Sequence, residues 1–205
     1  NTGFSIGFTG PDGSGKTTVI DLLIENLGDV FRKAHVYYHF RPVLFGNLGE
    51  VAHSAGMKKE VDRNYSQPHR GGKTGKVSSM VRLLYYSLDY IVGYWLKVKS
   101  VTRITRLVIF DRYYTDIICD SRRSRIYLNP KFLYWFGRLF IPSLNYNILL
   151  TAKTKTILSR KQELDVADIE AINRNIDYLA SKKGYYKVLN ESTPQAAVQA
   201  ILSYI

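Results

Sequence analysis

The segment GPDGSGKTT, Gly10 to Thr18, constrains the fold more than any other part of the sequence. It satisfies the pattern G-x-x-x-x-G-K-[ST] and lies between the apolar run FSIGFT and the helix-like run VIDLLIENL. Glycines let the backbone curl so that successive N–H groups face a phosphate, and the following helix adds its positive dipole end. In such a loop Lys16 reaches the outer phosphates and the Thr17 hydroxyl holds a magnesium ion. The alternative is a glycine-rich turn without a ligand, and the flanking strand and helix favour the phosphate loop.

Short apolar runs alternate with longer helix-like segments along the chain. The predicted strands are 4–9, 35–40, 106–110, 146–151 and 185–189, and the predicted helices are 16–27, 77–99, 131–140, 155–164, 165–182 and 194–205. Tyr, Val, Ile and Phe dominate the strands, most of which lack the alternation of a half-exposed strand, as strands buried on both faces should. Strands and helices in this order predict a doubly wound α/β fold around a parallel sheet.

The composition limits the class of protein. A chain of 205 residues with 45% hydrophobic and 22% charged residues is typical of one soluble domain, and no repeat or linker divides residues 1–205. The single cysteine, Cys119, excludes an internal disulfide framework and fits a reducing compartment. No apolar stretch reaches the roughly 18 residues of a membrane span, and the N-terminus lacks the layout of a signal peptide. We therefore expect a cytoplasmic protein.

The net charge of +12 indicates an anionic partner. Nucleic acid, anionic lipid and phosphorylated small molecules all fit a basic surface. The charge is concentrated in SRRSR (121–125) and HRGGKTGK (69–76), either of which is equally well explained as a solvated face. Because the sequence has no motif that reads RNA or DNA, we expect a small-molecule partner and no nucleic acid.

The stretch LVIFDRYYTD, 107–116, places an acidic and a basic residue together at the end of the third predicted strand. Ligands of such sheets bind at the carboxyl ends of the strands, so Asp111 and Arg112 should point toward the phosphate loop. An aspartate there can hold magnesium or orient an acceptor, and an arginine can bind a phosphate with two parallel hydrogen bonds. A strand-end ion pair is the alternative, and the neighbouring phosphate loop favours a chemical role.

Three segments resemble those of thymidylate kinases. GPDGSGKTT resembles the GxDGxGKTT loop of that family, FDRYYTD looks like its DRY-type motif, and SRKQELD (159–165) is similar to its arginine-bearing lid. The resemblance spans most of the chain. It implies a three-layer P-loop NTPase fold with a five-stranded parallel sheet in the order 2-3-1-4-5, with Mg-ATP as donor and a nucleoside monophosphate, dTMP, as acceptor. It also implies a homodimer.

The resemblance also implies roles for individual residues. Lys16, Arg112 and Arg160 would be catalytic, with Arg160 closing over the transferring phosphoryl group from a short lid at about 157–166. Thr17 and Asp111 would hold magnesium, and Arg112 would contact the acceptor's phosphate. The residues expected to bind ATP are Gly10, Asp12, Gly13, Ser14, Gly15, Lys16, Thr17 and Thr18.

The sequence departs from the family on the acceptor side. Where thymidylate kinases have an REPGGT-like stretch, this chain reads HFRPVLFGNLGE, which leaves Arg41 as the candidate acceptor ligand there. Residues 43–76 are polar and contain several glycines, as an acceptor-side insertion would. Together with Asp111 and Arg112, Arg82 and Asp89 on the long helix 77–99 are further candidates for the acceptor site.

Two segments have apolar patterns that allow more than one interpretation. On the helix 77–99, Leu84, Leu88, Ile91 and Trp95 recur near helical spacing, which predicts that they face the core. The segment FLYWFGRLF (132–140) predicts core or dimer contacts, and the basic residues nearby also allow a peripheral contact with a membrane surface.

Three functions from different classes follow. The first is a nucleoside monophosphate kinase of the thymidylate kinase type. The second keeps the fold and the donor but transfers the phosphoryl group to a sugar or surface glycan. The third is a nucleotide-binding regulatory module with weak catalysis, which the arginines at 112 and 160 disfavour because they suit phosphoryl transfer.

Overall fold

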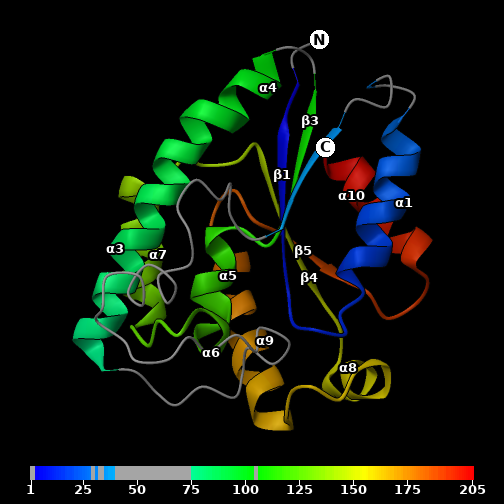
Figure 1. The fold of residues 1–205 in the computed structure, drawn as a ribbon. Coiled ribbons are helices and arrows are strands. Elements are labelled where there is room, and N and C mark those ends of the chain that lie inside the picture. The colour runs from blue at the N-terminus through cyan, green and yellow to red at the C-terminus, as the bar shows by residue number, and fades with distance from the viewer. Residues whose placement is uncertain (1–2, 29–30, 32–34, 40–74, 104–105) are drawn as a thin grey trace, which may run out of the picture.

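Five parallel strands form the central layer of the molecule (Figure 1). This computed structural model describes residues 3–28, 31, 35–39, 75–103 and 106–205. The strands are β1 (Ser5–Thr9), β2 (His35–His39), β3 (Leu107–Asp111), β4 (Tyr146–Thr151) and β5 (Tyr186–Leu189). Their order is β2-β3-β1-β4-β5, and each neighbouring pair is parallel. The predicted sheet and its strand order are confirmed.

Strand position in the sheet determines exposure. Every residue of β1 and β3 is buried, whereas the edge strands β2 and β5 are partly exposed, with Tyr37 and Leu189 open to solvent. A central parallel strand has a layer on each face, and an edge strand has a neighbour on one side only. The prediction of burial on both faces therefore holds fully for β1 and β3, while β4 is only partly buried at Tyr146 and Asn147.

Helices cover both faces of the sheet (Figure 1). One face is covered by α1 (Lys16–Gly28) and α10 (Pro194–Tyr204). The other is covered by α3 (Lys76–Gly93), α5 (Tyr114–Cys119), α7 (Pro130–Phe140) and α9 (Val166–Ala180). Short helices α6 (Ser121–Ser124) and α8 (Thr154–Arg160) lie at the carboxyl end of the strands. These layers bury two apolar clusters, one on each side of the sheet.

Several helix boundaries differ from the prediction. The helix predicted at 77–99 is α3 followed by a π-helical turn at Tyr94–Val98 and by α4 (Lys99–Arg103). The helix predicted at 155–164 ends at Arg160, because Lys161 has an extended backbone (φ −155°, ψ 128°). Helices α5 and α6 were not predicted, since each is too short to show a helical period.

The prediction that Leu84, Leu88 and Trp95 face the core is wrong. Each is more than half exposed, whereas Leu83, Ser87 and Tyr90 are buried on the opposite side of the helix. The Tyr90 ring packs edge-on against Tyr113 at a centroid distance of 4.9 Å. A search for apolar spacing missed this face because two of its buried residues are serines.

Helix α7 is buried along one side only. Leu133 and Phe136 lie in the core, as predicted for the segment 132–140, while Trp135, Leu139 and Phe140 are exposed. Across the described ranges, no helix combines the length and the apolar character that crossing a membrane requires.

Candidate active site

The phosphate loop brings the backbone close to its neighbours. A Cβ atom added to Gly10 would lie 1.9 Å from the carbonyl oxygen of Leu150, and one added to Gly15 would lie 2.5 Å from Asn190 Nδ2. Gly15 also has a φ of 85°, a conformation that favours glycine. The loop is further tied by Asn190 Nδ2, which donates to the carbonyl of Ser14 at 2.9 Å. The loop therefore keeps the curled shape that can present backbone N–H groups to a phosphate.

The ammonium group of Lys16 is held inside this loop. Lys16 is buried, and its Nζ donates to the carbonyl oxygens of Gly10 at 2.8 Å and Pro11 at 2.9 Å. Burial, together with the charge of Arg112, lowers the pKa of Lys16 to about 7, against the opposing effect of Asp12 and other carboxylates. Carbonyl dipoles are weak partners for a buried cation, so an incoming phosphate would be the stronger one.

Asp111 ends β3 beside the loop. Its Oδ2 accepts from the Tyr37 hydroxyl at 2.9 Å and lies 3.4 Å from His39 Nδ1. Burial alone would raise the pKa of Asp111, but the hydrogen bond from His39 and the charges of Lys16 and Arg112 outweigh it and bring the pKa to about 2. The carboxylate is therefore ionised at neutral pH.

The residues proposed for magnesium fit that ion. The second oxygen of Asp111, Oδ1, is buried and has no hydrogen-bond partner among the residues that the structure describes, and Asp111 and Thr17 line the same cavity. The described residues contain no group of three or more His, Cys, Asp or Glu side chains that could hold a metal ion. Mg²⁺ in phosphoryl-transfer sites uses one or two protein ligands together with substrate phosphates and water, which this pair allows.

Arg112 follows Asp111 and points into the loop. Its backbone has a φ of 75°, a conformation that is rare outside glycine. Its Nη1 donates to Asp116 Oδ1 at 3.0 Å and to the Gly10 carbonyl at 3.3 Å, while Nη2 donates to Asp12 Oδ1 at 2.5 Å. Burial would lower the pKa of Arg112, but Asp116 and Asp12 outweigh it and raise the pKa. Arg112 is thus a fully charged link between the loop and α5.

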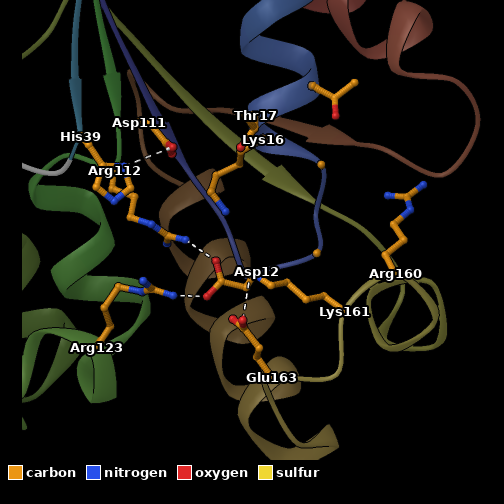
Figure 2. A pocket seen from close by; sticks show the side chains of 13 residues that line it. Asp12, Lys16, Thr17, His39, Asp111, Arg112, Arg123, Arg160, Lys161 and Glu163 are labelled. Atoms are coloured by element: carbon orange, nitrogen blue, oxygen red, sulfur yellow. Dashed lines mark hydrogen bonds and ion pairs between the residues drawn. The ribbon is translucent and has the colours of Figure 1, made fainter. Parts of the chain in front are cut away.

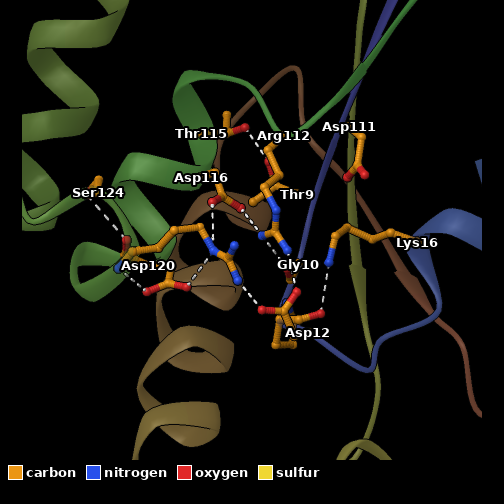
Figure 3. A network of polar contacts seen from close by, with 12 residues as sticks. Thr9, Gly10, Asp12, Lys16, Asp111, Arg112, Thr115, Asp116, Asp120 and Ser124 are labelled. Carbon is orange, nitrogen blue, oxygen red and sulfur yellow. Dashed lines mark hydrogen bonds and ion pairs between the residues drawn. The ribbon is translucent and has the colours of Figure 1, made fainter. Parts of the chain in front are cut away.

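Arg112 belongs to a larger ion cluster, which consists of Asp12, Arg112, Asp116 and Asp120 (labelled in Figure 3) together with Arg123 (labelled in Figure 2). Arg123 Nη2 pairs with Asp12 Oδ2, and Arg123 Nε lies 3.4 Å from Asp120 Oδ2. Burial raises the pKa of Asp116, and Asp120 adds to this, while Arg112 and Arg123 oppose it.

Sequence reasoning did not select Asp116, Asp120 or Arg123. The signal was the spacing of Arg112, Asp116 and Asp120, which are four residues apart, although in the structure only Asp116 lies within α5 while Arg112 precedes that helix and Asp120 follows it. Arg123 belongs to SRRSR, for which a solvated face was an equal alternative, and in the structure it lines the cavity. Its neighbour Arg122 instead pairs with Asp168 and is not among the residues that line this cavity.

A polar cavity of about 560 Å³ joins these elements (Figure 2). It is lined by Asp12, Gly13, Gly15, Lys16, Thr17, Thr18, His39, Asp111, Arg112, Arg123, Arg160, Lys161 and Glu163. On its lid side, Arg160 Nη1 donates to the carbonyl of Asn190 at 3.2 Å, and Lys161 pairs with Glu163 at 3.1 Å. The cavity therefore brings together the glycine loop, residues 160–163 and the ion cluster, which shares Asp12 with the loop.

The remaining predicted acceptor residues are not part of this cavity as described. Arg82 and Asp89 lie on α3, where Asp89 is fully buried, and neither lines the cavity. Arg41 and nearly all of the predicted insertion 43–76 lie outside the described residues.

The sheet order and the loop after β1 define a P-loop kinase fold of the thymidylate kinase type. Two solved structures are similar to this chain over its whole length. The thymidylate kinase of Ehrlichia chaffeensis matches with a TM-score of 0.62 and 16% identity, covering 100% of this chain and 99% of the other. The thymidylate kinase of Candida albicans matches with a TM-score of 0.66 and 16% identity, covering 100% of this chain and 91% of the other. Neither the protein-family models nor the curated proteins give a match to this sequence.

Proposed function

We propose that the protein is a phosphotransferase that moves the γ-phosphoryl group of Mg-ATP to a nucleoside monophosphate, with dTMP as the first acceptor to test. The main support is that a curled glycine loop with Lys16 lies in one cavity with Asp111, whose second oxygen is buried and finds no partner in the described part of the chain. The similarity of the fold to two thymidylate kinases supports the same reaction class. Phosphoryl transfer needs mainly positioning and charge neutralisation, and the cavity contains groups for both.

Each group at the donor end has a proposed task. The loop N–H groups and Lys16 bind the ATP phosphates, and a bound phosphate raises the pKa of Lys16 again because it replaces two carbonyls by an anion. Thr17 and Asp111 would hold Mg²⁺, which neutralises charge on the phosphates. Arg160 extends from α8 at the rim of the cavity and would close over the transferring group, as a lid cation does.

A specific observation favours a second candidate acceptor. The resemblance assigns Arg112 to the acceptor's phosphate, but both terminal nitrogens of Arg112 already donate to carboxylates. This departure leaves room for a non-nucleotide acceptor, such as a sugar or a surface glycan, with the same ATP site. The homodimer, the cytoplasmic location and a peripheral membrane contact are further predictions, and the exposed apolar residues of α3 and α7 fit the first and the last.

The deciding experiment measures Mg-ATP consumption against dTMP, dUMP, CMP, UMP, AMP and GMP, with simple sugars and no acceptor as controls. We expect saturable turnover with dTMP, and turnover with sugars alone would favour the second candidate. Lys16→Ala should reduce turnover by at least about 100-fold, since removing one preorganised charge contact costs that much in comparable sites. Lys131→Ala, which removes an exposed lysine on α7, is the matched control and should leave turnover unchanged. Near-normal turnover of a folded Lys16→Ala protein would contradict the proposal.

A further inference from the structure

Two guanidinium groups converge on one carboxylate of the phosphate loop. Asp12 accepts with one oxygen from Arg112, at 2.5 Å, and with the other from Arg123 (Figure 2). Two arginines arranged around one carboxylate form a binding site for a small oxyanion, since carboxylate and phosphate groups use the same charge-assisted hydrogen bonds. Here the loop's own Asp12 fills that site.

Asp12 is the most exchangeable carboxylate of the cluster. Its side chain is 13% exposed, compared with 2% for Asp116 and 7% for Asp120. Asp116 is fixed on α5 and pairs with Arg112, which precedes that helix. Asp120 begins α6 and accepts from the backbone N–H of Arg123 at 3.1 Å. Displacing Asp12 therefore breaks no helix cap and leaves each arginine with another carboxylate.

Arg123 is the more accessible of the two arginines. Its side chain is 16% exposed and that of Arg112 is 5% exposed, and both line the cavity. The Nη1 atom of Arg112 is already bound to Asp116 and to the Gly10 carbonyl. An anion that enters from the cavity consequently meets Arg123 with less rearrangement.

We propose that Arg123 binds the acceptor, and that an anionic group of the acceptor replaces Asp12 on Arg123 when the acceptor enters. The proposal rests on the proposed transfer reaction for the meaning of "acceptor". It places a phosphate or carboxylate on the acceptor, whether its scaffold is a nucleoside or a sugar, and it makes Arg123 a specificity-determining residue. Asp12 acts as the internal anion that fills the site in the unliganded protein.

The test measures equilibrium binding by calorimetry, so that it does not depend on turnover. The probes are two pairs that differ by one phosphate, dTMP with thymidine and glucose 1-phosphate with glucose, and ATP is titrated separately. Arg123→Gln removes the charge and Arg123→Lys keeps it. Arg122→Gln is the matched control, because it removes the neighbouring charge on α6, which pairs with Asp168.

We expect the wild-type protein to bind one phosphorylated probe at least about 10-fold more tightly than its unphosphorylated counterpart. Arg123→Gln should weaken that binding by about 10- to 100-fold, which is the range for losing one charged hydrogen-bond partner. Arg123→Lys should recover part of the loss, and the affinity for ATP should stay within about threefold in all variants. Which probe binds identifies the scaffold as nucleoside or sugar.

Other outcomes would overturn the proposal. These are no binding of either phosphorylated probe, equal binding of phosphorylated and unphosphorylated probes, or an Arg122→Gln loss as large as that of Arg123→Gln. A protein that transfers phosphate from ATP but whose acceptor binding is unaffected by Arg123→Gln would retain the proposed function and refute this inference. Acceptor binding that depends on Arg123, without any transfer, would do the reverse.

Discussion

Two regions of the cavity differ in the groups that form them: one is a backbone loop, and the other is a cluster of ionised side chains. At the proposed donor end, nine consecutive residues form a loop around a buried lysine, and main-chain carbonyls of this loop accept hydrogen bonds from Lys16 and Asn190. At the acceptor end, side chains from segments about a hundred residues apart, such as Asp12 and Arg112, meet in an ion cluster. A backbone site tolerates few substitutions because its shape depends on glycines, whereas a side-chain site can change its ligand through one or two residues. Under the proposed function, donor binding therefore depends on the backbone shape of the fold, whereas acceptor binding depends on a few individual side chains.

The largest effect should come from the acceptor end. Arg112→Gln leaves the buried Asp116 without its closest cation, and breaking a buried ion pair from one side costs about 3–5 kcal/mol of unfolding free energy. Urea unfolding measures the loss. Adding Asp116→Asn should restore part of it, because the uncompensated carboxylate is then gone.

The surface pair of Arg122 and Asp168 provides the control for this prediction. Arg122→Gln should change the unfolding free energy by less than about 1 kcal/mol, since exposed ion pairs contribute little. Equal losses for Arg112→Gln and Arg122→Gln would show that the ion cluster is not a buried structural link.

A smaller loss of stability, together with a large loss of ATP affinity, is expected at the proposed donor end. Gly15→Ala places a Cβ 2.5 Å from Asn190 Nδ2 at a φ of 85°, so the loop must shift to accommodate it. ATP affinity should fall at least about 10-fold, and stability by about 1–2 kcal/mol for the left-handed conformation alone. Calorimetry and thermal unfolding measure the two losses.

Gly184→Ala separates the cost of the left-handed backbone from the steric effect of the added Cβ on ATP binding. Gly184 has a φ of 93° and nothing within 4 Å of the added Cβ, so it should show the same backbone cost with unchanged ATP affinity. Normal ATP binding by Gly15→Ala would contradict the view that the donor end depends on backbone shape.

A pH dependence of the unfolding free energy is also expected at Lys16. Burial lowers the pKa of Lys16 to about 7, while the unfolded chain keeps the ordinary value near 10.5. Between these values the unfolded state binds more protons, so this lysine's contribution makes stability rise with pH above about 7, whereas below 7 the full cost of burying the charge is present. Lys16→Met should lack this rise in a denaturant series from pH 6.5 to 9. An identical pH profile for both proteins would contradict the assignment.

The sequence predicted the fold well because the information that specifies it is local. The pattern from Gly10 to Thr18 and the apolar strands around it led to the sheet order and the loop, and the structure confirms that fold. The ion cluster was missed because Asp12 and Arg123 become neighbours only when β1 and β3 pair. The buried face of α3 was misassigned because Ser79 and Ser87 pack inside while leucines face outward. Arg41 and the predicted insertion lie outside the described residues, so their roles stay predictions.

Asn190 connects the glycine loop, helix α8 and strand β4. Its side chain holds the loop through Ser14, its carbonyl receives Arg160 from the lid helix, and its own N–H donates to Thr151 at the end of β4. The loop proposed to bind the donor and the cation proposed to close over it are thus both hydrogen-bonded to Asn190. Asn190 is in turn hydrogen-bonded to the sheet. We therefore expect a movement of the loop to displace Arg160, and a movement of Arg160 to displace the loop, because both are hydrogen-bonded to Asn190.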